Sequence, residues 1–212
     1  MNYKEYNMKI KRFYENLTNY IKPGKALIIY GPRQVGKTTL LKDFLENSDL
    51  KYRLESGENI QIQTLFDSPN FQTLKEFVLG YQLVAIDEAQ KIKNIGEGIK
   101  IIIDQIPDIS IIATGSSSFE LAGQIGEPLT GRKTTLVLYP VSMMELSAMS
   151  NPFDVKNRLN EWLIFGGYPE VVSTENKDEK KKLLMEIAQS YLLKDILELE
   201  RVKSSKLLLD LL

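Results

Sequence analysis

The feature that most restricts the fold of this chain is an apolar run that leads directly into a glycine-bearing loop. Residues 26–30 read ALIIY, and Gly31 to Thr38 read GPRQVGKT, which satisfies the pattern G-x-x-x-x-G-K-[ST]. In this pattern, glycines free backbone N–H groups to surround phosphate oxygens at the start of a helix. A buried strand must enter the loop and a helix must leave it, and the sequence predicts both, with the helix over 36–45.

The alternation of apolar runs and helical stretches continues as far as residue 138. Further strands are predicted at 52–54, 82–86, 110–114 and 134–138, with helices at 74–79 and 98–105. Apolar strands separated by helices are typical of a parallel sheet covered by helices on both faces. Residues 1–145 are therefore predicted to form an α/β P-loop NTPase core, with an amphipathic N-terminal helix over 3–21.

Strand signals stop after Pro140, and the remainder of the chain is predicted to be helical. Helices are expected at 142–148, 156–165 and 178–201, so residues 146–212 are predicted to form a small helical lid and the start of a truncated C-terminal region. The lysines at 180–182 adjoin two acidic residues and are interpreted as a solvated helix start, not a nucleic-acid patch. The apolar stretch 207–212 either closes the lid or precedes a further domain, and we favour the second interpretation.

Composition removes several classes of chemistry. The chain contains no His and no Cys, which excludes a Ser-His-Asp triad, a Cys-His pair and cysteine-ligated metal centres. Carboxylates, Lys, Ser, Thr, backbone amides and Mg²⁺ remain, and these are the groups that phosphoryl transfer uses. The 27 basic and 28 acidic residues nearly cancel, so a broad basic face for nucleic acid is not indicated. The polar N-terminus and the lack of a long apolar run predict a cytoplasmic protein with no membrane span.

The loop residues have distinct expected roles in binding a nucleoside triphosphate. Lys37 is expected to reach the β- and γ-phosphates, the Thr38 hydroxyl to ligate Mg²⁺, and Thr39 to touch the α-phosphate. Arg33 either lies over the phosphates or faces solvent. The other residues of the cofactor-binding loop are Gly31, Pro32, Gln34, Val35 and Gly36.

Two adjacent acidic residues follow the predicted strand 82–86, at the sheet edge where ligands of open α/β sheets bind. Asp87 is predicted to hold Mg²⁺, and Glu88 to orient or deprotonate the attacking water. The alternative is a strand end that is merely capped by solvated acids. The run Asp87-Glu88-Ala89-Gln90 is not the D-x-x-G of a GTPase, so ATP is favoured over GTP.

Three further residues are candidates for contact with the γ-phosphate. Thr114 and Ser116 follow the strand 110–114 on the same edge, in the position of a phosphate sensor, although Ser116 to Ser118 could instead cap the next helix. Arg132 precedes the last predicted strand and is a candidate catalytic cation, either for its own nucleotide or for that of a neighbouring chain. Such a cation raises turnover by roughly 10³ to 10⁵. The alternative is an ordinary surface arginine.

With these residues in place, the chain resembles a broad prokaryotic family of AAA-type P-loop ATPases, in which a winged-helix and nuclease-like half follows the ATPase half. The matching blocks are GPRQVGKTTLL (31–41), VAIDEAQKI (84–92), ATGSSSFEL (113–121), LTGRKTTLVLYPVSMMEL (129–146), FGGYPEVV (165–172) and YLLKDIL (191–197). The resemblance implies an AAA-like core with a helical lid, ATP and Mg²⁺ as ligands, and Arg132 in the place of the family's Gly-Arg pair. It also places Gly166, Gly167 and Pro169 in a turn of the lid. The acidic residue that often follows the family's second strand is here at best Glu55, followed by Ser56.

Three functions are consistent with these patterns. The leading hypothesis is ATP hydrolysis with Mg²⁺, with lid closure coupling the nucleotide state to a protein partner, to self-association or to a downstream domain. The second is a nucleotide-dependent switch or scaffold with negligible turnover. The third is a DNA-associated ATPase whose DNA-binding part lies outside this sequence.

Overall fold

A computed structural model describes residues 10–115 and 128–189 of the chain. Internal contacts divide the molecule into two compact units. Of the described residues, 12–115 and 128–139 form the α/β unit, and 140–189 together with residues 10 and 11 form the helical unit. The chain thus passes between the units at 11–12 and at 139–140, whereas the boundary predicted at 145–146 falls within a helix (Met143–Ala148).

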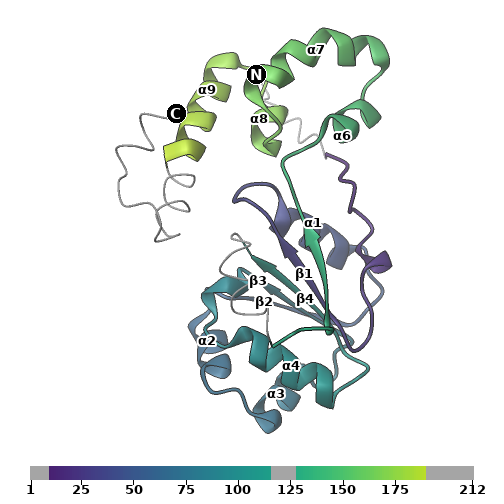
Figure 1. The fold of residues 1–212 in the computed structure, drawn as a ribbon, viewed down its shortest axis with the longest axis vertical. Helices are drawn as coiled ribbons and strands as arrows, with labels where there is room; N and C mark the ends of the chain where they lie inside the picture. The colour runs from purple at the N-terminus through teal and green to yellow at the C-terminus, as the bar shows by residue number, and fades with distance from the viewer. Residues whose placement is uncertain (1–9, 116–127, 190–212) are drawn as a thin grey trace, which may run out of the picture. The chain divides into compact units, whose positions relative to one another are not determined.

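The α/β unit is built on a five-stranded parallel sheet (Figure 1), in which the strand order is β2-β3-β4-β1-β5. Its strands are β1 (Ala26–Tyr30), β2 (Tyr52–Ser56), β3 (Leu83–Asp87), β4 (Ser110–Gly115) and β5 (Lys133–Val137). All five predicted strands are confirmed to within two residues of their predicted ends. Central position explains the apolar sequences of β1, β3 and β4, which are buried except for the last residue of β3, whereas the edge strands β2 and β5 are more polar and more exposed.

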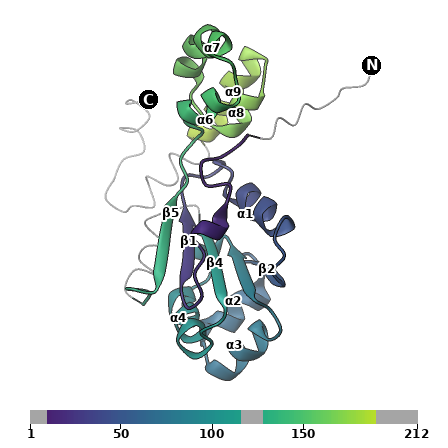
Figure 2. The same ribbon diagram turned by 90° about the vertical axis from the view of Figure 1, so that its right-hand side faces the viewer.

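Helices connect the strands and cover the sheet. They are α1 (Lys37–Glu46), α2 (Ile60–Asp67), α3 (Phe71–Val78) and α4 (Ile95–Gln105), with a 3-10 helix η2 (Ala89–Lys91) after β3. Helices α2, α3 and α4 lie together in Figure 2, and their apolar residues share one core with alternate residues of β1, β3 and β4. Helix α1 lies against β4. The arrangement confirms an α/β fold of the P-loop NTPase type, and α2 is the helix that sequence patterns missed among those described in this unit.

The N-terminal helix predicted over 3–21 is wrong in the part that the structure describes. Between residues 10 and 25, only η1 (Leu17–Asn19) is helical, and the Asn16 side chain caps it. The apolar residues recur at helical spacing, but they pack in different places. Ile10 packs against the core of the helical unit, whereas Leu17 is fully buried in the α/β unit. One amphipathic face is therefore not needed to bury them.

The helical unit contains α6 (Met143–Ala148), α7 (Pro152–Phe165), α8 (Pro169–Ser173) and α9 (Lys177–Ile187). Side chains of Ser142, Asn151 and Asn176 cap the starts of α6, α7 and α9. Two small apolar cores hold the helices together, one around Trp162 and one around Phe165. The three predicted helices are confirmed, with α9 followed only to Ile187. Gly166 and Gly167 lie in the connection between α7 and α8, where a turn was expected, whereas Pro169 begins α8, a helix that was not predicted. Residues 190–212, including the apolar stretch 207–212, lie outside the described residues.

One lysine of the 180–182 run corrects the interpretation of that run as solvated. Lys180 is 1% exposed, and its ammonium forms an ion pair with Glu161 of α7 at 2.8 Å. The same ammonium lies over the ring of Phe165. Lys180 therefore joins α9 to α7 inside the helical unit, and only its neighbours Lys181 and Lys182 face solvent. Of the helices that the structure describes, none combines the length and the apolar character needed to cross a membrane.

Candidate functional site

The predicted phosphate-binding loop joins the carboxyl end of β1 to the start of α1. Within it, Gln34 and Gly36 have left-handed backbones with φ of 60° and 93°. Gly31 begins the loop where no side chain fits, because a Cβ there would lie 1.9 Å from the carbonyl oxygen of Leu138. The loop therefore turns tightly onto the N-terminus of α1, the geometry in which backbone N–H groups bind anions.

Lys37 is held inside this loop. It is the first residue of α1 and is 5% exposed. Its Nζ donates hydrogen bonds to the carbonyl oxygens of Gly31 at 2.9 Å and Pro32 at 2.7 Å. A buried ammonium with carbonyl acceptors can exchange these partners for phosphate oxygens without leaving the loop. The other loop side chains differ in exposure, since Pro32, Gln34 and Thr39 are exposed, Arg33 is half-buried and Val35 is buried.

The carboxylate at the end of β3 accepts hydrogen bonds from hydroxyl groups on two neighbouring elements. Thr38 of α1 donates from Oγ1 to Oδ2 of Asp87 at 2.7 Å, and the hydroxyl of Thr114 in β4 donates to the other carboxylate oxygen. Thr114 is fully buried. The structure thus brings together Thr38 and Asp87, the two residues predicted to hold Mg²⁺. Ser116, the other sensor candidate, lies outside the described residues.

These oxygen donors fit a magnesium ion. Mg²⁺ prefers oxygen ligands and is commonly held by one or two carboxylates together with substrate phosphates and water. The Thr38 hydroxyl and the Asp87 carboxylate lie next to the loop that would hold those phosphates. They could therefore hold the ion at the edge of the sheet, with the remaining positions left to phosphate and water.

Glu88 is fixed by contacts on both sides. Its backbone is left-handed with φ of 53°, and its N–H donates to Oγ1 of Thr114 at 3.4 Å. Its carboxylate accepts a hydrogen bond from Nε2 of Gln90 at 2.6 Å, and Gln90 is itself 9% exposed. On the β2 side, a Cβ at Gly57 would lie 2.2 Å from the Glu88 carbonyl oxygen. Sequence patterns assigned no role to Gln90, although an amide donor two residues after Glu88 could have indicated a partner for the Glu88 carboxylate.

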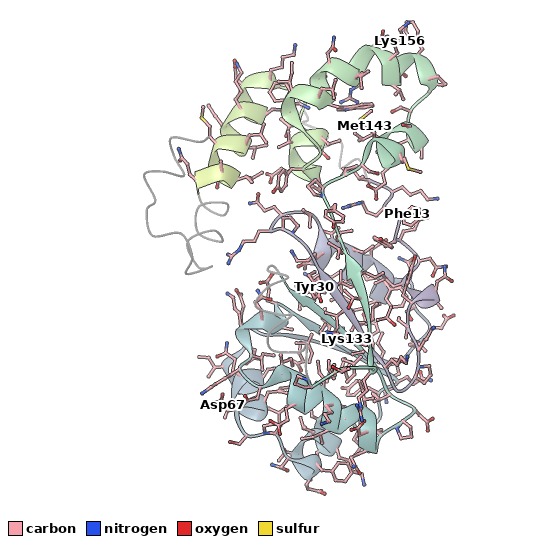
Figure 3. All side chains as sticks on the ribbon, viewed as in Figure 1. Phe13, Tyr30, Asp67, Lys133, Met143 and Lys156 are labelled. Carbon is pink, nitrogen blue, oxygen red and sulfur yellow. The ribbon has the colours of Figure 1, made fainter. Side chains whose placement is uncertain are left out.

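Arg132 lies at the amino ends of the strands, whereas the phosphate-binding loop of its own chain follows the carboxyl end of β1. Strand β5 is parallel to β1 and pairs Lys133 with Ala26, so Arg132 stands at the amino ends of these strands (Figure 3 labels Lys133 and Tyr30). The five residues of β1 separate the two edges by about 16 Å at ~3.3 Å per residue, farther than an arginine side chain extends. Its Nε bonds Asp104 at 2.6 Å. This distance speaks against contact with its own nucleotide, and a catalytic role for Arg132 stays a prediction, for which action in a neighbouring chain is the alternative that the geometry leaves.

Comparisons with known proteins show the family to which the chain belongs. A family model described as an AAA domain matches residues 23–147, more than half of the chain. A second model, described as a domain of unknown function, matches residues 156–212. A Walker-type ATPase of Pyrococcus abyssi, PABY2304, has a similar structure, with a TM-score of 0.58 and 20% identity over 91% of this chain and 76% of that one. The chain belongs to the AAA-domain family of P-loop ATPases.

Curated relatives extend well beyond the matched region. Uncharacterized protein MJ1544 of Methanocaldococcus jannaschii is 26% identical over 199 residues, which cover 87% of this chain and 44% of that protein. An uncharacterized protein of Haemophilus influenzae is 28% identical over 215 residues, covering 90% of this chain and 50% of that protein. The chain thus spans about half the length of these relatives.

Proposed function

We propose that this chain binds ATP together with Mg²⁺ and hydrolyses it, and that the nucleotide state controls a protein partner, self-association or a downstream domain. The observation that carries the proposal is the convergence of Thr38 and Thr114 on the Asp87 carboxylate, next to the loop that contains Lys37. A bound Mg²⁺ would supply charge neutralisation for the phosphates.

The chain's own residues then divide the work of hydrolysis. Backbone N–H groups of the loop bind the phosphates, and the Lys37 ammonium offsets the charge on the terminal phosphates. Glu88 lies directly after Asp87 at the same edge, where its carboxylate can orient a water molecule and accept its proton. Gln90 holds that carboxylate in place. This assignment gives each group a task that its position permits.

The division into two units supports control by the nucleotide. The helical unit is reached directly from Leu138 and Tyr139, the residues that follow β5, and Leu138 contacts the loop through the close approach at Gly31. A change at the loop therefore has a short route to the helical unit. The same observation also serves the second candidate function, a switch that binds ATP with negligible turnover.

The decisive experiment measures both ATP affinity and phosphate release with Mg²⁺-ATP. We expect Lys37→Ala to abolish binding. Glu88→Gln should keep the Kd for ATP within about threefold and lower turnover by roughly 10² or more, because the general base is lost. Glu97→Gln, at an exposed position on α4, is the matched control and should behave as the wild type.

Each alternative gives a different result. If Glu88→Gln turns over as fast as the wild type, Glu88 does not act on the water. If the wild type binds ATP but releases phosphate no faster than Lys37→Ala, the chain is a switch and not a hydrolase by itself. If Lys37→Ala and the wild type bind ATP equally, the proposed nucleotide site is wrong.

A further inference from the structure

An arginine outside the nucleotide-binding motifs connects the phosphate-binding loop to the junction between the two units. The Arg12 guanidinium donates from Nη1 to the carbonyl oxygen of Val35 at 2.7 Å and from Nη2 to the carbonyl oxygen of Tyr139 at 2.5 Å. Val35 lies inside the loop, and Tyr139 is the last residue of the α/β unit. One planar, charged group therefore bonds two backbone carbonyls that are far apart in sequence.

The bond to Val35 bears on how the loop can bind phosphate. The peptide that joins Val35 to Gly36 is trans, so its carbonyl and its N–H point in opposite directions. A guanidinium that fixes the Val35 carbonyl on one side therefore fixes the direction of the Gly36 N–H on the other. A charged donor on the carbonyl also polarises the peptide and strengthens its N–H as a donor.

The two residues joined by the bond to Tyr139 are each adjacent in sequence to residues that are anchored within the helical unit. Just before Arg12, Ile10 packs against the Trp162 core, and the Lys11 N–H donates to Sδ of Met149 at 3.3 Å. Just after Tyr139, Val141 is buried in the same core, and its N–H donates to the Gly167 carbonyl at 2.6 Å. The chain thus passes between the units at two places. Arg12 stands at the first, and its guanidinium bonds Tyr139 at the second and Val35 in the loop.

We infer that Arg12 is a positioning residue that sets the Val35–Gly36 peptide for phosphate binding and transmits the state of the loop to both connections of the helical unit. The inference rests on the proposed function for its consequence, nucleotide-dependent control, whereas the two hydrogen bonds of Arg12 are observed independently of that function. A lysine at position 12 would keep the charge, yet its single nitrogen could not span both carbonyls as a guanidinium does.

The test compares wild type, Arg12→Gln, Arg12→Lys and Lys22→Gln, all in the full 212-residue chain. Lys22 is an exposed cation in the same segment and serves as the matched control. Calorimetry gives the Kd for ATP with Mg²⁺, and amide hydrogen exchange of the nucleotide-free protein reports on residues 32–38 and 139–149. A third measurement is the change in exchange at 139–149 when ATP is added.

We expect Arg12→Gln to weaken ATP binding about tenfold, to accelerate exchange in both segments of the nucleotide-free protein, and to abolish the ATP-dependent change at 139–149. Arg12→Lys should lose protection in one segment and keep it in the other, whereas Lys22→Gln should match the wild type in all three measurements. If Arg12→Gln keeps wild-type affinity and wild-type exchange in both segments, the inference is overturned.

Two further outcomes also decide against it. Exchange that accelerates equally in β1 and α4 would mean that Arg12 only stabilises the fold, and full rescue by lysine would remove the need for a bridging guanidinium. Failure of the proposed function is distinguishable, because it appears as absent ATP binding in the wild type. The exchange of the nucleotide-free protein then still decides whether Arg12 holds the loop and the junction together.

Discussion

Replacing Thr114 with valine would isolate the contribution of one buried hydroxyl to the candidate metal site. Valine has nearly the shape of threonine, so the change opens little space, but it removes the donor to the Asp87 carboxylate. A hydrogen bond to a charged group contributes about 1.5–3 kcal/mol. The hydrogen bond from the Glu88 N–H to the same hydroxyl is long at 3.4 Å, so we assign it little free energy. We take about 2 kcal/mol as the free energy of the two contacts together.

This energy converts into a measurable change in metal dependence. If the hydroxyl serves to orient the Asp87 carboxylate, about 2 kcal/mol corresponds to a roughly thirtyfold increase in the Mg²⁺ concentration that gives half-maximal ATP turnover. The assay is phosphate release as Mg²⁺ is varied at saturating ATP. Thr114→Ser is the control, because it keeps the hydroxyl and loses one buried methyl, at a cost of about 1 kcal/mol in stability.

The two variants separate orientation from packing. We expect Thr114→Ser to keep a Mg²⁺ dependence close to that of the wild type while unfolding somewhat more easily in urea. Thr114→Val should show a large shift in Mg²⁺ dependence, whatever its own effect on unfolding in urea. Equal Mg²⁺ dependence in the two variants would refute the reasoning, since it would mean that the hydroxyl does not control the carboxylate.

Two more predictions concern charged side chains away from the loop. The hydrogen bond from Lys180 holds the pKa of the Glu161 carboxyl below its ordinary value, so the stabilisation from this pair is present at neutral pH and lost as pH falls through that lowered pKa. Glu161→Gln should therefore lower the free energy of unfolding by about 2 kcal/mol at pH 7, and by progressively less as the pH is lowered. Urea titrations over a series of acidic pH values test this, with exposed Lys181→Met as the control, and a loss that does not change with pH would contradict it. If Arg132 acts in a neighbouring chain, the specific rate of phosphate release should rise with protein concentration in the wild type and stay flat in Arg132→Ala; a flat wild-type curve would rule that role out.

Local patterns predicted the core of the site because its parts are local. The loop from Gly31 to Thr38 is directly preceded by an apolar strand and continues into a helix, and Asp87 directly follows an apolar run. Since parallel strands place their carboxyl ends at one edge, the meeting of Asp87 with Thr38 and Thr114 also followed from the predicted sheet. The same logic applied to Arg132 would have placed it at the other edge, because it precedes its strand instead of following it.

The remaining errors involve partners that are distant in sequence. Lys180 looked solvated because Glu161 lies on another helix, and the burial of a cation depends on such a partner. Arg12 gave no local signal, since its acceptors at Val35 and Tyr139 are residues that any sequence could supply through its backbone. The prediction of an N-terminal helix over 3–21 was wrong in the described part for a related reason, because apolar spacing alone does not reveal that the residues pack in two different units.

The close approach at Gly31 has a practical consequence for genetics on this protein. Any side chain at Gly31 would collide with the Leu138 carbonyl, on the segment that leads to the helical unit. A Gly31 substitution made to abolish nucleotide binding would therefore also displace that segment, and its phenotype would mix two defects. Lys37→Ala removes an ammonium without adding atoms, so it is the cleaner null allele for separating loss of nucleotide from loss of the connection.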